Sequence, residues 1–378
     1  MACFNYLRPL PMSAVAEPLA SAASQPALSW PTDGSKAAIG ADGYGVLASN
    51  TNETPIPTAS IAKVITALSV LRQKPLNVGQ QGPTLTLTEA DVQSYRDYLA
   101  QDGSVTLVAA GEQITEYQVL QAMLLPSANN MADTLAVWAF GSMQAYHTFA
   151  TSYVKQLGLA HTTIGPDASG LSPLTTSTPS DLVQLGIIAM RQPIIAEIVH
   201  QKSATIPTAG TIYNNNRMLG TNGVNGLKTG YSDQALGCIL FAANYSPEPG
   251  TNFTLVGVIM GAKTLGQAFS SGATLLQSAK NNFAKEQVVQ KGQALGSVYV
   301  PWLRTSVPLF AHESLSAVVW NHGITPADVH ITPITDAVAK NTPIGTATFT
   351  SGTTHFEVPV SVGQAIAKPM TWWRILHW

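Results

Sequence analysis

The chain has 378 residues, and its 19 lysines and arginines nearly balance its 21 aspartates and glutamates. This balance argues against a nucleic-acid-binding protein, which usually carries a basic surface. Charged residues make up 11% and apolar residues 45%, so the chain can bury a large core and is not disordered over most of its length. No run of about 18 apolar residues occurs, so no transmembrane helix is predicted.

Residues 1–27 are predicted to form a poorly ordered tail, because Pro, Ala and Ser follow one another there without a sustained periodicity. Short small-residue stretches at 14–16 and 20–22 are similar to signal-peptide cleavage sites, but the segment before them lacks an apolar core. A trimmed signal remnant and a plain Ala-rich linker are both open interpretations.

Helices and antiparallel strands alternate over residues 28–284. Asp42-Gly43 predicts the turn of a hairpin over 36–49. Apolar residues at helical spacing and capping residues before apolar runs predict helices at 61–71, after Thr88, from Thr115 to Pro126, at 129–140 and at 264–283. Two β-rich runs, 236–245 and 253–262, predict a second hairpin. Together these elements predict an antiparallel sheet flanked by helices, of the α/β or α+β class.

The character of the sequence changes near residue 285. Short strand-like runs punctuated by Gly, Pro and Asn predict an all-β, sandwich-like domain over 285–378. The runs are 288–289, 297–300, 315–320, 329–334, 347–349 and 356–362. The terminal segment, Trp372 to Trp378, is too short for a stable membrane anchor and is predicted to be a last strand with two buried tryptophans.

Metal and disulfide chemistry have little support in this sequence. Cys3 falls in the predicted tail and Cys238 in an apolar run, which disfavours a disulfide. The eight histidines are scattered, and neither H-E-x-x-H nor C-x-x-C occurs. No metal site and no cofactor is therefore predicted.

Three short motifs follow one another along the chain: Ser60-Ile61-Ala62-Lys63, Ser127-Ala128-Asn129 and Lys228-Thr229-Gly230. Each is weak alone, because helix-capping serines, a surface lysine or a charged strand edge would account for it. The three in this order, each in a fitting context, are specific; penicillin-binding proteins and class A β-lactamases carry a related trio.

The first motif predicts a nucleophile with its base. Residues three apart share a helix face, so Lys63 can reach Ser60. No G-x-S-x-G segment occurs and no histidine lies near Ser60 in the sequence, so Lys63 is the natural base for a serine nucleophile. Burial and a neighbouring cation would both favour the neutral amine.

Several longer segments resemble the D-alanyl-D-alanine carboxypeptidases, the low-molecular-weight penicillin-binding proteins. They are Pro126–Asp133, Asp167–Leu171 with Ser177–Leu182, and Gly226–Tyr231. The resemblance is strong over about residues 28–283 and looser over the β-rich remainder. It implies a β-lactamase/transpeptidase-like catalytic domain with a C-terminal sandwich.

The resemblance also implies roles for single residues. The catalytic ones are Ser60 as nucleophile, Lys63 as base and Ser127 as proton relay. Substrate binding falls to Asn129, Lys228, Thr229, Gly230 and Tyr231, with the backbone N–H groups of Ser60 and Tyr231 as the oxyanion hole. The implied partners are a peptidoglycan stem peptide as substrate and β-lactams as inhibitors, at an extracytoplasmic location and without a specified oligomeric state.

Two departures from the family pattern stand out. The small-residue run expected after the third motif is Gln234-Ala235-Leu236-Gly237-Cys238, in which Leu236 is bulky. The segment after the second hairpin lacks the arginine expected to anchor the substrate carboxylate, and Lys263 is the nearby cation.

Two alternatives share these motifs. A class A β-lactamase needs a glutamate for deacylation. Glu197 is the one glutamate between Ser127 and Lys228, and its neighbours do not fit the E-x-x-L-N pattern. A catalytically silent penicillin- or peptidoglycan-binding protein is the other alternative, and the intact Ser60, Lys63, Ser127 and Lys228 argue against it.

Overall fold

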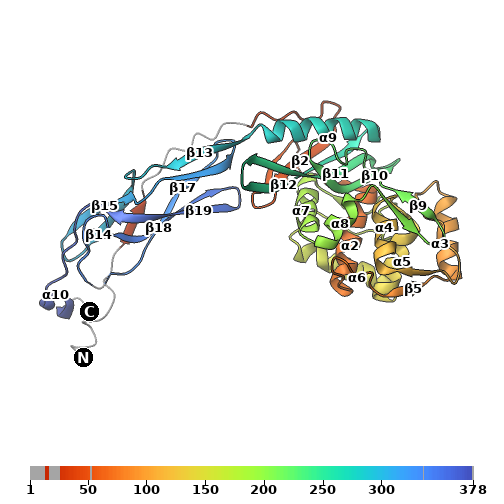
Figure 1. The fold of residues 1–378 in the computed structure, drawn as a ribbon, viewed down its shortest axis with the longest axis horizontal. Coiled ribbons are helices and arrows are strands. Elements are labelled where there is room, and N and C mark those ends of the chain that lie inside the picture. The colour runs from red at the N-terminus through yellow and green to blue at the C-terminus, as the bar shows by residue number, and fades with distance from the viewer. Residues whose placement is uncertain (1–12, 17–25, 52, 335, 377–378) are drawn as a thin grey trace. The chain divides into compact units, whose positions relative to one another are not determined.

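The computed structural model of the chain describes residues 13–16, 26–51, 53–334 and 336–376. The chain divides into two compact units (Figure 1). The larger comprises Ala27–Ser246 and Asn252–Asn281, and the smaller includes Pro247–Thr251 and the chain from Asn282 onward. The sequence placed the boundary at 284/285; that each unit folds by itself stays a prediction.

An antiparallel sheet forms the middle of the larger unit. Its strands, in spatial order, are β10 (Val224–Ser232), β11 (Leu236–Glu248), β12 (Thr251–Ala262), β2 (Lys36–Ala41) and β3 (Gly45–Ser49). The third sequence motif lies on β10, which ends this order. The hairpins predicted at 36–49 and 236–262 are both confirmed.

Helices cover both faces of this sheet (Figure 1). Side chains alternate between the faces along β11. A Cβ on Gly186 would lie 3.1 Å from Leu240, and a Cβ on Gly272 would lie 3.2 Å from Phe241. Since Gly186 belongs to α7 (Pro179–Met190) and Gly272 to α9 (Leu265–Lys280), these two helices lie on opposite faces.

The remaining helices of this unit lie on the α7 side of the sheet together with α2 (Ala62–Gln73), in which all residues from Ala62 to Leu71 are buried (Figure 1). They are the 3-10 turn η1 (Ala59–Ile61), α3 (Glu89–Leu99), α4 (Glu116–Leu124), α5 (Asn129–Phe140), α6 (Met143–Gln156) and α8 (Pro193–His200). A helix that is buried on every side is enclosed by other elements, and α2 takes the polar Lys63, Thr66 and Ser69 into the interior with it. The helices predicted at 61–71, after Thr88, from Thr115, at 129–140 and at 264–283 are confirmed.

Short two-stranded ribbons complete the larger unit. They are β4 (Ile56–Pro57) with β7 (Thr176–Ser177), β5 (Thr84–Thr86) with β6 (Gln113–Thr115), and β8 (Ser203–Ile206) with β9 (Gly210–Tyr213). The first ribbon leads directly into η1 and helps to fix where the chain enters α2.

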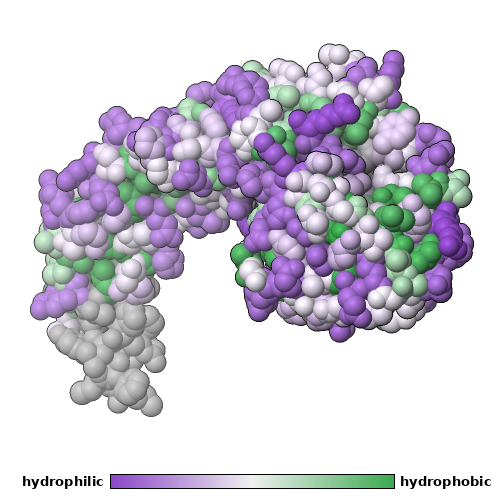
Figure 2. All heavy atoms as spheres, turned by 45° about the vertical axis from the view of Figure 1, so that its right-hand side comes forward, coloured by the Kyte–Doolittle hydropathy of each residue, from purple (hydrophilic) through white to green (hydrophobic). Residues whose placement is uncertain are grey.

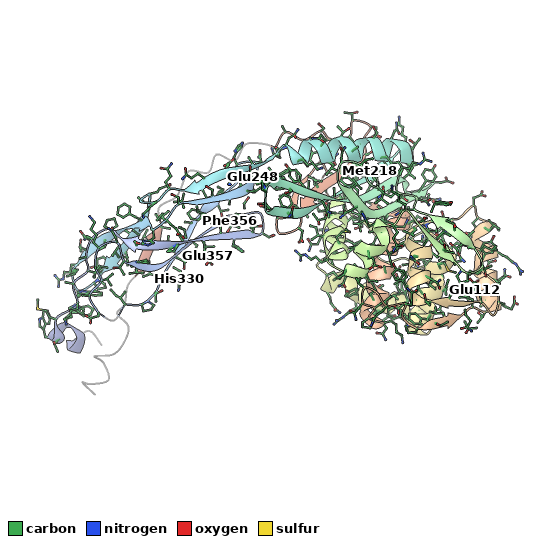
Figure 3. The ribbon with its side chains drawn as sticks, viewed as in Figure 1. Glu112, Met218, Glu248, His330, Phe356 and Glu357 are labelled. Carbon is green, nitrogen blue, oxygen red and sulfur yellow. The ribbon has the colours of Figure 1, made fainter. Side chains whose placement is uncertain are left out.

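The smaller unit is β-rich, as predicted. One sheet has the order β1 (Ser13–Ala16), β14 (Ala294–Val300), β15 (Thr305–Ala311), β19 (Thr354–Val362), β18 (Pro343–Ser351) and β17 (Thr325–Ile331); β13 (Phe283–Val289) pairs with β16 (Leu315–Trp320). Residues alternate between core and solvent: Phe356 packs on the core of this unit, whereas the next residue, Glu357, is exposed (Figure 3).

The prediction of a poorly ordered tail is wrong for Ser13–Ala16, which form β1 and pair antiparallel with β14. The close approach depends on Gly296, because a Cβ there would lie 2.2 Å from the carbonyl oxygen of Val15. A four-residue strand that pairs with a segment so distant in sequence leaves no local periodicity. The other residues of the predicted tail, with Cys3, lie outside the described residues, apart from Pro26 and Ala27.

The prediction of a last strand at the C-terminus is also wrong, because Thr371–Leu376 form the short helix α10. A hydrogen bond from Trp373 N to Met370 O (2.9 Å) begins its turn. Trp373 is 8% exposed and packs edge-on against Trp302, with ring centroids 5.7 Å apart, whereas Trp372 is 56% exposed. One buried tryptophan therefore replaces the predicted two, and Trp378 lies outside the described residues.

Polar and apolar side chains intermix over the face in Figure 2, as the low content of charged residues suggests. Within the described segments, no single helix is long and apolar enough to cross a membrane; α7 and α8 pass that test only as a pair bent by 98°. Cys238 is buried on β11 with a free thiol, and burial raises its pKa to about 11.

Candidate active site

Ser60 lies in η1, the turn from which α2 continues. The turn is held by a bond from Thr58 N to Thr175 O (3.1 Å) and places Ala59 at a positive φ of 46°. Gly170 lies against it, because a Cβ on Gly170 would come within 2.2 Å of Ala59 O. The Ser-Gly-Leu segment recognised in the sequence therefore packs under the serine, where only glycine fits.

Lys63 lies one turn after Ser60 and is 0% exposed. Its Nζ lies 2.8 Å from Ser60 Oγ, 2.7 Å from Asn129 Oδ1 and 2.9 Å from Ser169 O. Burial lowers the pKa of this amine to about 7, against the charges of Asp167 and Asp133, which favour its protonated form. Neutral amine is thus available at ordinary pH.

These three contacts orient the amine for proton abstraction. A neutral amine has two N–H groups and one lone pair. Asn129 Oδ1 and Ser169 O can only accept, so they take the two N–H groups, and the lone pair is left for the Ser60 hydroxyl. Lys63 can therefore receive the proton of Ser60 without moving.

The third motif faces Ser60 from β10. A Cβ on Gly230 would lie 2.9 Å from Ser60 N and 3.0 Å from Ala59 Cβ, so the strand lies directly against η1. Thr229 is buried, whereas Tyr231 is 54% exposed. The absence of a side chain at Gly230 brings the backbone of Tyr231 beside the backbone of Ser60.

Lys228 lies beneath this strand, 1% exposed, with its Nζ donating to Thr229 O at 2.9 Å. Burial lowers its pKa well below the usual range, and the charge of Lys63 lowers it further. Burying two neighbouring amines, whose protonation is disfavoured in the folded state, lowers the free energy of unfolding at neutral pH.

Replacing Lys228 with methionine is therefore expected to raise the free energy of unfolding by about 1–2 kcal/mol at pH 7. The gain should shrink toward pH 10, because the lysine in the unfolded chain then loses its proton as well. Urea unfolding at both pH values measures it, with the exposed Lys202→Met as control. A Lys228→Met variant no more stable than the wild type at pH 7 would contradict this account.

Ser127 sits between α4 and α5 with a positive φ of 72°. It is 4% exposed, and its hydroxyl has no hydrogen-bond partner. The relay predicted to join Ser127 to the two lysines is thus not closed by hydrogen bonds here. A buried, unpartnered hydroxyl beside a cleft offers a place for a polar atom of a ligand.

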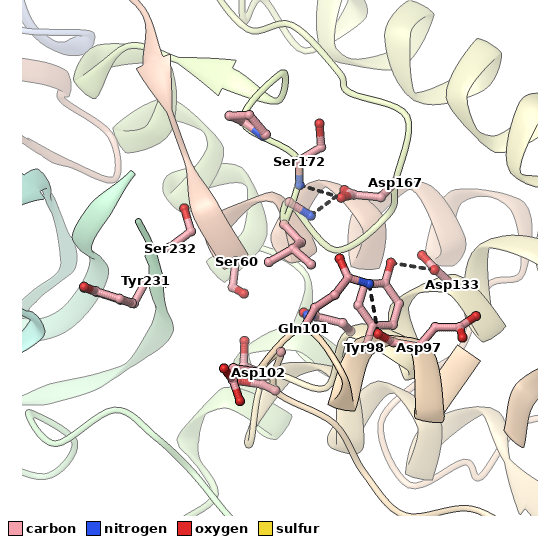
Figure 4. A pocket seen from close by; sticks show the side chains of 18 of the residues that line it. Ser60, Asp97, Tyr98, Gln101, Asp102, Asp133, Asp167, Ser172, Tyr231 and Ser232 are labelled. Atoms are coloured by element: carbon pink, nitrogen blue, oxygen red, sulfur yellow. Dashed lines mark hydrogen bonds between the residues drawn. The ribbon is translucent and has the colours of Figure 1, made fainter. Parts of the chain in front are cut away.

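A cleft of about 1160 Å³ opens over these residues (Figure 4). Of the predicted site residues, its lining includes Ser60, Ser127, Asn129, Thr229, Gly230 and Tyr231. Lys63 and Lys228 lie below its floor. The opposite wall comes from α3 and the turn after it, with Asp97, Tyr98, Gln101 and Asp102. All eight residues predicted from the sequence are thus brought to one site.

Comparison with known proteins places this arrangement in a family. The sequence profile of the D-alanyl-D-alanine carboxypeptidase family matches residues 22–264. The chain belongs to this family. The match contains all three motifs and ends at the start of α9, so the predicted family is confirmed.

Individual carboxypeptidases agree with this result. One from Streptomyces sp. strain K15 is 27% identical over 244 residues, which cover 60% of this chain and 79% of that protein. One from Mycobacterium tuberculosis is 30% identical over 200 residues, which cover 51% of this chain and 64% of that protein.

Solved structures confirm the predicted fold class. The D-alanyl-D-alanine carboxypeptidase DacD of Francisella tularensis has a TM-score of 0.65 at 15% identity and covers 93% of this chain and 97% of that one. The Streptomyces K15 DD-transpeptidase has a TM-score of 0.59 at 24% identity and covers 66% of this chain and 98% of that one. These likenesses show a shared fold.

The structure shows where the two departures from the family pattern, Leu236 and Lys263, lie. Leu236 lies at the β10–β11 turn with a positive φ of 57°. The position that must stay small is Gly237, because a Cβ there would lie 2.6 Å from Thr264 O. Lys263 is exposed and interacts with Asp33, whose pKa its charge helps to lower. Lys263 is not one of the described residues that line the cleft.

The position of Glu197 disfavours a β-lactamase with a deacylating glutamate. Glu197 lies on α8, where its carboxylate accepts a hydrogen bond from the Tyr117 hydroxyl at 2.6 Å. In the part of the chain that the structure describes, the cleft lining does not include it.

No role was predicted from the sequence for several of the residues that support Lys63, although Asp133, Asp167 and Ser169 lie in the segments that resemble the family. Ser169 supplies the carbonyl, and Asp133, Tyr98 and Asp167 surround it. The available signal was a carboxylate at Asp133, within the mostly apolar segment Met131–Phe140 of α5. Its partner Tyr98 could not be found this way, because it lies on another helix.

Proposed function

We propose that this chain is a serine-type D-Ala-D-Ala carboxypeptidase that acts through an acyl-enzyme on Ser60. The observation that carries the proposal is the 2.8 Å contact between Lys63 Nζ and Ser60 Oγ, made by an amine whose burial lowers its pKa to about 7. A serine is a weak nucleophile until a base takes its proton. Family membership supports the same reaction class.

In the first half-reaction, Ser60 Oγ bonds to the carbonyl carbon of the penultimate D-alanine while its proton passes to Lys63. The bond between this carbon and the amine of the terminal D-alanine then breaks. Ser127, whose hydroxyl is buried without a partner, carries the proton to that amine. In the second half-reaction, water attacks the ester and Ser60 regains its proton.

The oxyanion that forms on the carbonyl would be bound by the backbone N–H groups of Ser60 and Tyr231. Support comes from Gly230, which brings β10 against η1. Fixed donors of this kind are each worth about 3–4 kcal/mol in the transition state. Thr229 and Lys228 would bind the terminal carboxylate, whose charge offsets the cost of protonating a buried lysine.

Asn129 contacts the proposed base, Lys63, in addition to the substrate-binding role that the sequence predicted. Its side-chain oxygen accepts from Lys63, so it orients the base. Its NH₂ group remains to meet the substrate's amide, because Asn129 also lines the cleft. The substrate class is peptidoglycan stem peptides, with β-lactams as inhibitors, and the site of action is the cell envelope outside the cytoplasm.

Release of D-alanine from a stem pentapeptide tests the proposal, with Ser60→Ala as control. The wild type is expected to release one D-alanine per peptide, and Ser60→Ala none. Labelled penicillin should also remain attached to the peptide that contains Ser60. An adduct on another peptide would refute the mechanism, rapid hydrolysis of the adduct would favour the β-lactamase alternative, and labelling without D-alanine release would favour a silent binding protein.

A further inference from the structure

Asp133 lies on α5, one turn after Asn129, and therefore on the same face of that helix. Its Oδ2 accepts a hydrogen bond from the Tyr98 hydroxyl at 2.7 Å, and its Oδ1 lies 3.4 Å from Ala168 N. Figure 4 shows Tyr98 pointing from α3 toward this carboxylate. Asp133 thus joins α3, α5 and the segment that carries Ser169.

That segment is held at several points. Asp167 accepts from Gly170 N at 2.8 Å and from Ser172 N at 2.7 Å, and Thr66 Oγ1 donates to Ala168 O at 2.6 Å. The next carbonyl along, that of Ser169, receives Lys63 at 2.9 Å. The amine that takes the proton of Ser60 is therefore positioned by a loop that Asp133 and Asp167 brace.

Burial and several of the neighbouring groups act on the pKa of Asp133 in opposite directions. Burial raises the pKa of Asp133 to about 6, while the Tyr98 hydrogen bond and the charge of Lys63 favour its ionised form. The groups that face it or its helix are Lys63 from α2, Tyr98 from α3, Tyr146 from α6 and Asp167 from the loop, with Asp91 of α3 bonded to the adjacent Thr134. Near neutral pH, Asp133 and Asp167 thus offset part of the cost of burying a protonated Lys63.

We propose that Asp133, held by Tyr98, is a positioning residue for Lys63: it fixes the Ala168–Ser169 backbone that receives the amine, and its charge, together with that of Asp167, favours the protonated amine. The proposal rests on the proposed function, in which Lys63 is that base. Removing the charge of Asp133 makes protonation of Lys63 less favourable. The acidic limb of the acylation profile should then move to lower pH.

The test is the second-order rate constant for acylation by a penicillin between pH 5 and 9. Asp133→Asn keeps the shape of the side chain and removes its charge, so its acidic limb should lie about 1 pH unit below that of the wild type. Tyr98→Phe removes a bond that favours ionised Asp133, so its limb should shift in the same direction by less. Each profile is scaled to its own plateau rate at high pH, so that the position of the acidic limb is compared independently of any change in the plateau.

Asp91→Asn is the matched control, because Asp91 also accepts a hydrogen bond from α5, through Thr134 Oγ1 at 2.7 Å. Its limb should coincide with that of the wild type even where thermal unfolding shows lost stability. An Asp133→Asn variant that loses stability or rate while its limb stays in place would make Asp133 merely structural and overturn the inference. If Asp133→Asn does not fold, Tyr98→Phe provides the test: an acidic limb at the same pH as that of the wild type would overturn the inference. A wild type that penicillin does not acylate at Ser60 would instead refute the proposed function.

Discussion

Replacing Lys63 with arginine is expected to slow acylation of Ser60 by about 10²–10⁴-fold, the usual contribution of a positioned general base. The buried amine of Lys63 has a pKa lowered to about 7 and lies 2.8 Å from Ser60 Oγ, whose proton it accepts in the proposed mechanism. Arginine remains protonated at any accessible pH and has no lone pair to offer. The measurement is the rate of acylation by labelled penicillin, with Ser60→Ala marking complete loss.

The pH profile separates loss of the base from loss of the fold. In the wild type the rate should rise as pH passes through the region near 7, because Lys63 then loses its proton and becomes a base. Lys63→Arg should show no such rise, and the exposed Lys202→Arg should match the wild type. Substantial activity in Lys63→Arg with an unchanged profile would remove Lys63 from this role and point to Ser127 with Lys228.

Gly230→Ala is expected to lower the acylation rate by about 10²–10³-fold, which is the loss of one oxyanion donor. The new Cβ would lie 2.9 Å from Ser60 N and 3.0 Å from Ala59 Cβ. These atoms belong to the backbone or sit next to it, so neither can rotate away. β10 must then move from η1, and the N–H groups of Ser60 and Tyr231 no longer converge.

Gly266→Ala, near the start of α9, is the matched control for this substitution. The nearest atom to its new Cβ is Thr264 Oγ1 at 3.7 Å, an ordinary contact. Its acylation rate should stay within about twofold of the wild type. If Gly230→Ala acylates as fast as Gly266→Ala, the two N–H groups do not form the oxyanion hole.

The components of the site could be predicted from the sequence because each rests on a short-range regularity. Ser60 and Lys63 are three residues apart on a helix, so their contact follows from helix geometry. Ser127 follows the proline after α4, and Asn129 is the first residue of the next helix, α5. Gly230 sits on a strand where a glycine permits close approach of another backbone. Their order along the chain pointed to penicillin-binding proteins and β-lactamases, and the longer segments around them pointed to the carboxypeptidase family.

Contacts between segments far apart in sequence needed the tertiary structure. Tyr98 and Asp133 lie on different helices, so no periodicity relates them, although their 2.7 Å bond braces the loop behind Lys63. The same reason hid the pairing of Ser13–Ala16 with β14. At the C-terminus, the apolar Trp372-Trp373 segment had no period to separate strand from helix, and packing of Trp373 on Trp302 accompanies the helix.

The sequence by itself thus determined the family, the sheet-and-helix architecture and the candidate catalytic side chains, because helical spacing, turn residues and motif order are local properties. Only the tertiary structure determined the pKa values and the orientations of those side chains. The depressed pKa of Lys63 comes from complete burial of its side chain, and its orientation comes from Asn129 and Ser169. Burial and long-range contacts depend on how the whole chain packs, which no short stretch of residues encodes.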